Sequence, residues 1–236
     1  MKPSIKLALF DLDNTLIDTH GVFLAKKNEL LNFWSNYFPQ ETVKDMATDW
    51  DNLLVDAFHL YNVNPKKLWP FVIEGLNKKH KNFSSYKDES FKILWSIYTT
   101  LPPEFPGARK LLSHIQEQSI PMGLVTHAEK DWTDFKLDKH DIRKYFQEII
   151  ICDVTKPKTS ANWITAINAF NIKPEETVIL GDNIKGDILS GQEIGVKHLV
   201  WVNVTAGWKV YKTGHLPEGV VEVRKLDEID LEKLLQ

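Results

Sequence analysis

Two aspartates, Asp11 and Asp13, stand directly after a short apolar run at residues 7–10. Apolar runs of this length are typical of buried strands in a parallel sheet. Carboxylates are costly to bury, so at the end of such a strand they must meet water, a cation or a ligand. Ligands of open α/β sheets bind at the carboxyl ends of the strands. We therefore expect the pair to lie in a functional site, where a divalent cation would neutralise its crowded negative charge.

Polar residues also follow three later apolar runs that read as strands. They are Thr126, Lys156 with Lys158, and Asp182 with Asp187. Together with the first pair, these strand ends supply carboxylates, a hydroxyl and an amine, which is a set suited to phosphoryl transfer. Carboxylates hold Mg²⁺, and a hydroxyl and an ammonium bind phosphoryl oxygens. One carboxylate can act as a nucleophile, and a second can exchange protons with the leaving oxygen and with water.

The elements that must position these residues alternate between strand and helix. Apolar runs predict strands at 7–10, 122–125, 148–151, 177–180 and 198–202, and helices are expected at about 108–118, between 125 and 148, and at about 160–170 and 187–194. This alternation is typical of right-handed βαβ units on a parallel sheet. From Thr205 onward we expect a glycine-containing loop, an edge strand at 220–223 and a short final helix.

The segment between the first strand and residue 100 has a different pattern. Apolar residues recur there at helical spacing and predict four helices, the first through Phe23 and Trp34 and the second over 43–61. Closely spaced prolines from Pro102 to Pro106 end the segment. The fold class expected is therefore α/β: a three-layer Rossmann-like parallel-sheet core at 1–18 and 101–236, with an all-helical cap at 19–100 inserted after the first strand. The insert leaves and returns on the side of Asp11 and Asp13, so it can cover the site.

Composition narrows the classes of function. The chain has 236 residues, a formal net charge of -3 and 43% hydrophobic residues. The absence of a basic excess argues against a nucleic-acid partner. A single cysteine, Cys152, fits a reducing compartment. We find neither a signal-peptide core nor an apolar run long enough to span a membrane, so a soluble, cytoplasmic protein without a membrane partner is expected.

The motifs resemble those of a known family. The segment Asp11-Leu12-Asp13-Asn14-Thr15, followed by Thr126, Lys156-Pro157 and Gly181-Asp182-Asn183 with Asp187, is similar to the four ordered motifs of the haloacid dehalogenase-like hydrolase superfamily. The helical insert resembles the cap that this superfamily places between its first and second motifs. The sequence departs from the common pattern at His127, where Asn often stands, and at Thr159, where many relatives have a second proline.

The resemblance implies a role for each motif residue. Asp11 would be the nucleophile and Asp13 the general acid and base. Mg²⁺ would be held by Asp11, the Asp13 backbone carbonyl and Asp182, with Asp187 supporting or joining the metal shell; Asp187 read alone could also simply begin a helix. Thr126 and Lys156 would bind the phosphoryl group, and Asn14 and Thr15 would shape the loop that faces it.

Two lysines compete for the phosphate. Lys156 and Lys158 are two residues apart, so in an extended segment their side chains point to opposite faces. Pro157 favours an extended conformation at Lys156, which also matches the family's Lys-Pro pattern. We therefore expect Lys156 to face the site and Lys158 to face away from it.

The function indicated is a Mg²⁺-dependent phosphatase that hydrolyses a small phosphorylated metabolite through an aspartyl phosphate. A phosphomutase of the same fold is an alternative, because it would transfer the same phosphoryl group to a second hydroxyl. A dehalogenase is disfavoured, because by family resemblance dehalogenases lack the second aspartate supplied here by Asp13. A non-catalytic binding protein remains a further class, which no feature of the sequence supports. The sequence does not name the phosphomonoester.

Overall fold

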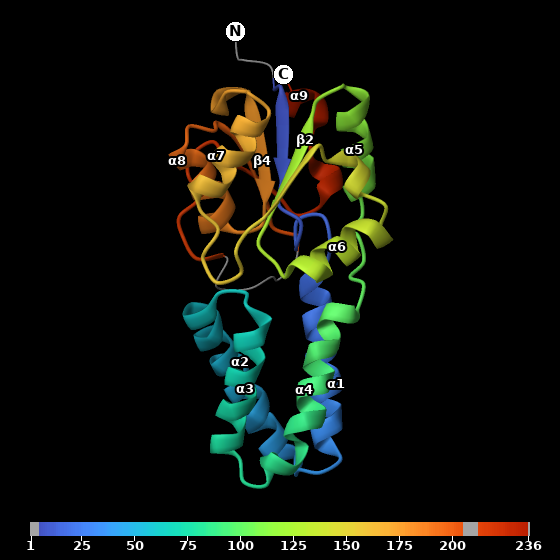
Figure 1. Cartoon of the computed structure of the whole chain (residues 1–236), viewed down its shortest axis with the longest axis vertical. Helices are drawn as coiled ribbons and strands as arrows, with labels where there is room; N and C mark the ends of the chain where they lie inside the picture. The colour runs from blue at the N-terminus through green and yellow to red at the C-terminus, as the bar shows by residue number, and fades with distance from the viewer. Residues whose placement is uncertain (1–4, 205–211, 236) are drawn as a thin grey trace. The chain divides into compact units, whose positions relative to one another are not determined.

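The computed structural model describes residues 5–204 and 212–235. Part of the glycine-containing loop expected after Thr205 lies outside these residues. The chain divides into two compact units. The core unit comprises the described residues of Met1–His20, Pro102–Asp153 and Pro157–Gln236, and the helical unit comprises Gly21–Leu101 and Val154–Lys156. Figure 1 shows both units along the chain.

A six-stranded sheet forms the centre of the core unit, and every strand pairs in parallel with its neighbours. The strands are β1 (Leu7–Phe10), β2 (Met122–Thr126), β3 (Glu148–Ile151), β4 (Thr177–Gly181), β5 (His198–Val202) and β6 (Val221–Val223). Their order, β3-β2-β1-β4-β5-β6, is that of doubly wound α/β sheets. In such sheets ligands bind where the order reverses, which here is at the ends of β1 and its neighbours. The predicted α/β fold is confirmed.

Helices cover both faces of this sheet (Figure 1). They are α5 (Ala108–Glu117), α6 (Lys130–Lys139), α7 (Ser160–Ala169), α8 (Ser190–Glu193) and α9 (Leu231–Leu235). The alternation of side chains along β1 divides the core in two: Ala8 and Phe10 pack in the cluster that contains α5, whereas Leu7 and Leu9 pack in the cluster that contains Trp163 of α7. Both faces of β1 are therefore apolar, which explains its unbroken apolar sequence.

The helix expected at about 187–194 begins earlier and is wound differently. A π-helix spans Ile184–Leu189 and is followed by α8. The Asn183 side chain accepts hydrogen bonds from the backbone N–H groups of Lys185 and Gly186, which caps the π-helix three residues before the predicted start. The N–H of Ile188 lies 3.4 Å from the Asn183 carbonyl, the wider i+5 spacing of a π turn. Asp187 therefore lies inside the first turn.

The four helices expected before residue 100 are present, and all but the first two residues of α1 belong to the helical unit. They are α1 (Thr19–Ser35), α2 (Gln40–Tyr61), α3 (Pro65–Lys79) and α4 (Lys87–Trp95), with short 3-10 turns at Phe83–Tyr86 and Ser96–Thr99. Trp34, Trp50 and Trp69 are buried between the helices, as an apolar interior requires, whereas Trp95 is 37% exposed. The Asn62 side chain donates a hydrogen bond of 3.0 Å to the Thr155 carbonyl, which ties residues 154–156 to this unit.

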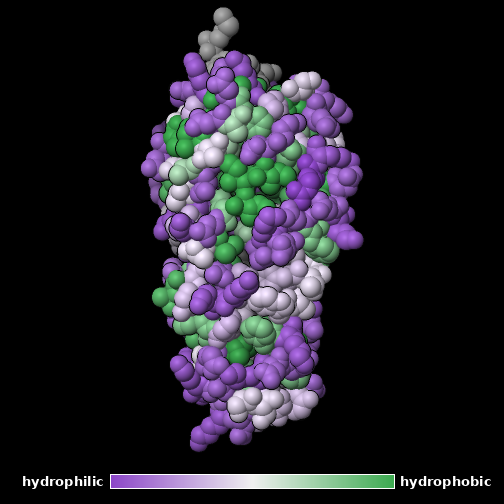
Figure 2. Space-filling model, in the orientation of Figure 1, coloured by the Kyte–Doolittle hydropathy of each residue, from purple (hydrophilic) through white to green (hydrophobic). Residues whose placement is uncertain are grey.

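The chain leaves the core unit and returns to it at adjacent positions. The N–H of Asp18 donates to the Pro103 carbonyl at 2.9 Å, and Ile17 forms an antiparallel bridge with Glu104. Asp18 follows shortly after the Asp11–Thr15 loop in the sequence, and Pro103 is held beside it by this hydrogen bond. On the face shown in Figure 2, hydrophilic residues cover most of the surface and hydrophobic residues gather in smaller groups between them. Among the described residues, we find no helix long and apolar enough to cross a membrane.

Candidate active site

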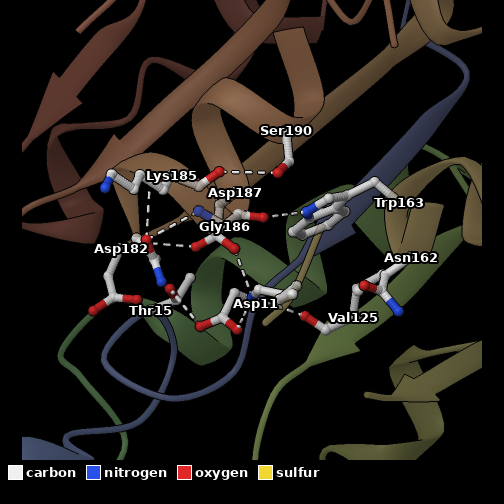
Figure 3. Close-up of polar contacts among 12 residues, drawn as sticks. Asp11, Thr15, Val125, Asn162, Trp163, Asp182, Lys185, Gly186, Asp187 and Ser190 are labelled. Atoms are coloured by element: carbon white, nitrogen blue, oxygen red, sulfur yellow. Dashed lines mark hydrogen bonds and ion pairs between the residues drawn. The ribbon is translucent and has the colours of Figure 1, made fainter. Parts of the chain in front are cut away.

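Asp11 continues the backbone pairing of β1 and begins the site. Its N–H donates to the Leu180 carbonyl of β4 at 2.9 Å, so the carboxylate is fixed beside the end of that strand. The chain then turns tightly, with the N–H of Leu16 donating to the Leu12 carbonyl and Asn14 in the left-handed region at φ 61°. Asparagine tolerates this conformation better than most residues. The turn brings the Thr15 hydroxyl within 3.1 Å of Asp11 Oδ2, to which it donates (Figure 3).

Asn14 stabilises the next segment of the chain. Its Oδ1 accepts a hydrogen bond of 2.8 Å from the backbone N–H of His20, in the first turn of α1. Asn14 and Thr15 are both buried. Their side chains thus bond to the first turn of α1 and to Asp11.

Lys158 is the buried cation of the site. Its ammonium lies 2.6 Å from Asp11 Oδ1 and 2.6 Å from Asp187 Oδ1. It also donates to the Val125 carbonyl at the end of β2, at 3.3 Å. The Lys158 side chain is 4% exposed, so these partners replace the water that its charge would otherwise require.

Lys156 does not have the placement expected from the sequence. It is exposed and belongs to the helical unit, whereas Lys158 belongs to the core unit and reaches Asp11. Residues 154–156 form a turn and a bend instead of an extended segment, so Pro157 does not direct Lys156 from the end of β3 toward the site. The site lysine instead lies just before α7, whose first turn is capped by Thr159 and Asn162.

Three carboxylates converge beside Lys158. Asp11, Asp182 and Asp187 each offer an oxygen, and these oxygens lie within 4.8 Å of one another. Figure 3 shows the three aspartates grouped together, with Asp182 on the left and Asp187 above Asp11. One ammonium cannot balance three carboxylates, and oxygen donors at this spacing fit a hard divalent cation such as Mg²⁺. The predicted metal-ligating side chains are thus brought together.

Burial sets the protonation of this cluster. It raises the pKa of Asp11 to about 7; Lys158 opposes the rise and Asp187 adds to it. Burial also raises the pKa of Asp182 well above its ordinary value, and the charges of Asp11 and Asp187 act in the same direction. Burial disfavours the charged form of Lys158, but Asp11 and Asp187 outweigh it and raise the pKa of that ammonium. Without a further cation, Asp11 and Asp182 therefore hold protons more readily than ordinary carboxyl groups do.

Neighbouring elements hold the backbone that carries Asp182 and Asp187. The indole N–H of Trp163, on α7, donates to the Gly186 carbonyl at 2.7 Å, as Figure 3 shows. The indole N–H of Trp201, on β5, donates to the Asp182 carbonyl at 2.8 Å. Asp187 Oδ2 accepts the backbone N–H of Asn183 at 2.9 Å, which orients its carboxylate toward Lys158.

Asp13 lies beside this cluster with its two oxygens in different environments. Oδ1 accepts hydrogen bonds from the Lys136 ammonium and from the Thr19 hydroxyl. Oδ2 is buried, and within the described residues it has no hydrogen-bond partner. Thr126 presents a similar case at the end of β2, because its buried hydroxyl oxygen has no partner in the described parts of the chain.

Lys136 was missed by the sequence reasoning. It lies on α6 and is fully buried. Trp132, Thr133, Lys136 and Leu137 form the buried face of this helix at one-turn spacing. A lysine within an otherwise buried helical face is the signal that could have found it, because lysine is almost never fully buried without a partner.

Residues 8–201 match the family model described as haloacid dehalogenase-like hydrolase. The chain belongs to this family. Among curated proteins, this family member is 28% identical to a glyceraldehyde 3-phosphate phosphatase of Pyrococcus furiosus, over 84% of this chain and 80% of that protein. It is 26% identical to the pyrophosphatase PpaX of Bacillus mycoides, over 92% of this chain and 93% of that protein.

Solved structures share the fold of this haloacid dehalogenase-like hydrolase. YfnB from Bacillus subtilis, described as a HAD-hydrolase and bound to magnesium, superposes with a TM-score of 0.68 at 20% identity. The alignment covers 99% of both chains.

Proposed function

We propose that this chain is a Mg²⁺-dependent phosphatase that hydrolyses a small phosphomonoester through an aspartyl phosphate on Asp11. The observation that carries the proposal is the clustering of the Asp11, Asp182 and Asp187 carboxylates beside the buried Lys158 ammonium, which contacts Asp11 and Asp187. A fourth carboxylate, Asp13, lies beside them. Membership of the hydrolase family supports the reaction class, and the similarity to the glyceraldehyde 3-phosphate phosphatase supports a phosphorylated metabolite as substrate.

The carboxylate cluster fits Mg²⁺. Asp11 and Asp182 would hold the ion through side-chain oxygens, Asp13 through its backbone carbonyl, and Asp187 would complete or support the shell. Bound Mg²⁺ supplies positive charge that offsets the charge of the substrate's phosphoryl oxygens. Its charge would also relieve the repulsion that raises the pKa values of Asp11 and Asp182.

The first half of the reaction transfers the phosphoryl group to the protein. A carboxylate oxygen of Asp11 forms a bond to phosphorus while the bond between phosphorus and the ester oxygen breaks. The electron pair of the broken bond goes to the ester oxygen, which takes a proton from Asp13 and leaves as an alcohol. Lys158 and Thr126 bind the phosphoryl oxygens in this proposal, with Lys158 in the role expected of Lys156.

The second half releases phosphate. Asp13, now a carboxylate, takes a proton from a water molecule as the water oxygen bonds to phosphorus. The bond between phosphorus and Asp11 breaks, and its electron pair regenerates the Asp11 carboxylate. The net reaction consumes one water and yields an alcohol and inorganic phosphate. Asn14 and Thr15 keep the loop in shape through both steps.

We also propose that the helical unit acts as a cap that selects among phosphomonoesters. The support is the path of the chain. The segment that forms the helical unit leaves the core unit shortly after Asp18 and returns to it at about Pro103, and the Asp18 N–H is hydrogen-bonded to the Pro103 carbonyl. Asp18 itself follows shortly after Asp13 in the sequence.

Asp11→Asn tests the nucleophile. The amide keeps the shape of the side chain but is not an attacking anion, so we expect release of inorganic phosphate from a panel of phosphorylated metabolites to fall to background. Circular dichroism should show the fold unchanged. Turnover close to wild type in this variant would refute the mechanism.

Chelation tests the metal. We expect EDTA to abolish phosphate release and excess Mg²⁺ to restore it, because the cluster needs a cation of this kind. Full activity in excess EDTA would contradict the Mg²⁺ requirement. A phosphomutase would isomerise its substrate without releasing phosphate, so measuring both products separates it from a phosphatase.

A further inference from the structure

Lys136 is a second buried cation near the site, and it contacts Asp13. Its side chain is fully buried on α6, and its ammonium donates to Asp13 Oδ1. The same ammonium lies 4.1 Å from the centre of the Trp132 ring, within the range of a cation–π contact. The Thr19 hydroxyl donates to the same oxygen of Asp13.

Such a pair is not explained by stability alone. Removing an ammonium and a carboxylate from water costs several kcal/mol per ion, and their attraction often does no better than repay it. Apolar residues of similar size would pack the same space at least as well. The position of Lys136 therefore calls for a role that an apolar side chain could not fill.

The contacts of Asp13 indicate that role. Two donors, one from Lys136 and one from Thr19, occupy Oδ1 and fix the carboxyl group about its side-chain torsions. Oδ2 is buried and has no hydrogen-bond partner among the described residues. The two oxygens of one carboxyl group therefore differ: Oδ1 is held by two donors, whereas Oδ2 has no hydrogen-bond partner among the described residues and could accept or donate a proton.

We infer that Lys136 is a positioning residue, which holds Asp13 by Oδ1 so that Oδ2 faces the oxygen of the leaving group. This inference rests on the proposed phosphatase function. Lys136 does not touch the substrate. When the bond between phosphorus and the ester oxygen breaks, the proton passes from Asp13 Oδ2 to that oxygen, and Oδ1 keeps its contacts with Lys136 and Thr19 throughout.

A positioned acid matters only when the leaving group needs a proton. An alkoxide leaves poorly without one, whereas p-nitrophenolate is stable as an anion and needs none. Misplacing Asp13 should therefore slow hydrolysis of alkyl phosphates far more than hydrolysis of p-nitrophenyl phosphate. A merely structural loss would lower both rates alike, so the ratio of the two reports on positioning.

The experiment measures kcat/KM of Lys136→Met for a series of alkyl and aryl phosphates with Mg²⁺ present. Methionine keeps the length and removes the donor. We expect kcat/KM for alkyl phosphates to fall by about 10-fold to 100-fold, part of the 10²–10⁴-fold that a general acid typically supplies. The value for p-nitrophenyl phosphate should change by less than about 3-fold. Equal losses for both classes, or no loss for either, would overturn the inference.

Two further variants complete the test. Lys139 is an exposed lysine on the same helix, so Lys139→Met should have the kcat/KM of wild type for both classes of substrate. Thr19→Val removes the second donor without removing a charge, and we expect the same selective loss at smaller size; this variant decides the matter if Lys136→Met fails to fold. Uniform losses in a folded Thr19→Val would count against the inference.

Asp11→Asn separates failure of this inference from failure of the proposed function. If that variant retains turnover, the aspartyl phosphate mechanism fails and the comparison of leaving groups loses its basis. If Asp11→Asn is inactive and Lys136→Met loses activity uniformly, the mechanism stands and only the positioning role of Lys136 is rejected.

Discussion

Lys158 binds two carboxylates at once, which makes it important for the charge balance of the site. Its ammonium is 2.6 Å from both Asp11 and Asp187, so removing it leaves two buried carboxylates without their shared cation. Loss of one partner of a buried charge pair is costly for the partner that remains. The same ammonium contacts Asp11, so in the proposed mechanism it would be placed to bind a phosphoryl group attached there.

The two lysines of the Lys-Pro-Lys segment should behave very differently when mutated. We expect Lys158→Met to lower kcat/KM by about 100-fold or more, the loss typical of one oxyanion-binding donor in a water-poor site. Lys156→Met should change it by no more than about 3-fold, because water screens an exposed ammonium. Steady-state kinetics on both variants, with thermal unfolding as the control for stability, checks this. The opposite ranking would return the phosphate-binding role to Lys156.

The sequence could identify which residue types meet at the site but not which lysine reaches it. Asp11, Asp182 and Asp187 follow apolar runs whose ends must meet in a parallel sheet, so their convergence was predictable. The lysine was not, because residues 154–156 turn and pack with the helical unit, a tertiary contact that local spacing does not encode. The contact of Lys136 with Asp13 could not be predicted either, because it depends on how α6 packs in the folded core unit.

At the scale of elements, β4 and the π-helix pack closely together where Gly181 lies against the side chain of Asp187. A Cβ atom added at Gly181, the last residue of β4, would overlap the carboxyl group of Asp187. Asp187 lies within the π-helix, which begins at Ile184, and its carboxyl group accepts the N–H of Asn183 beside Gly181. Such π turns are frequent at functional sites.

Gly181→Ala should therefore impair metal binding more than folding. The methyl group has to displace Asp187, which disturbs one of the three clustered carboxylates. We expect the Mg²⁺ concentration for half-maximal activity to rise about 10-fold or more, the loss typical when a group that orients a metal ligand is disturbed. Calorimetric titration with Mg²⁺ would measure the same change without activity.

Gly191→Ala is the matched control for that variant. A Cβ at Gly191 would crowd the apolar side chains of Ile179 and Leu199 at 2.9 Å, away from the carboxylates. Overpacking of this kind typically costs about 1–3 kcal/mol of stability. Gly191→Ala should thus lower the melting temperature and leave Mg²⁺ affinity unchanged. Wild-type affinity in Gly181→Ala would show that Asp187 moves aside without consequence.

Most helices and strands could be predicted from the sequence because each kind has a recognisable pattern of apolar residues. The buried strands are unbroken apolar runs, and the helices of the helical unit repeat apolar residues at helical spacing. The π-helix could not be predicted, because it depends on the Asn183 side chain capping the backbone and on Trp163 bonding to Gly186. The order of the strands likewise follows from packing between helices and sheet, beyond any one segment.

At the scale of the whole molecule, the charge cluster links the stability of the protein to protons and, in the proposed function, to Mg²⁺. Burial raises the pKa of Asp11 from 3.8 to about 7, so between these values the folded protein binds more protons than the unfolded chain. The contribution of Asp11 to the free energy of unfolding is therefore fully present below the unfolded pKa, and it is lost as pH rises through the folded pKa. Asp182 acts in the same direction. His20 acts in the opposite direction, because burial lowers its pKa. Its effect makes stability fall as the solution becomes more acidic than the ordinary histidine pKa of 6.5.

We therefore predict that Mg²⁺ stabilises the protein more at about pH 8 than at about pH 6.5, because protons compete with the ion for the same carboxylates. In EDTA the free energy of unfolding should fall by about 1 kcal/mol from the lower to the higher pH, since the folded protein loses the proton that Asp11 holds. Thermal and urea unfolding at both pH values, with EDTA and with Mg²⁺, measures this. In Asp11→Asn the dependence in EDTA should become shallower, because asparagine does not titrate. A metal-free protein that gains stability toward pH 8, or a Mg²⁺ effect equal at both pH values, would mean that the carboxylates are already ionised without a cation.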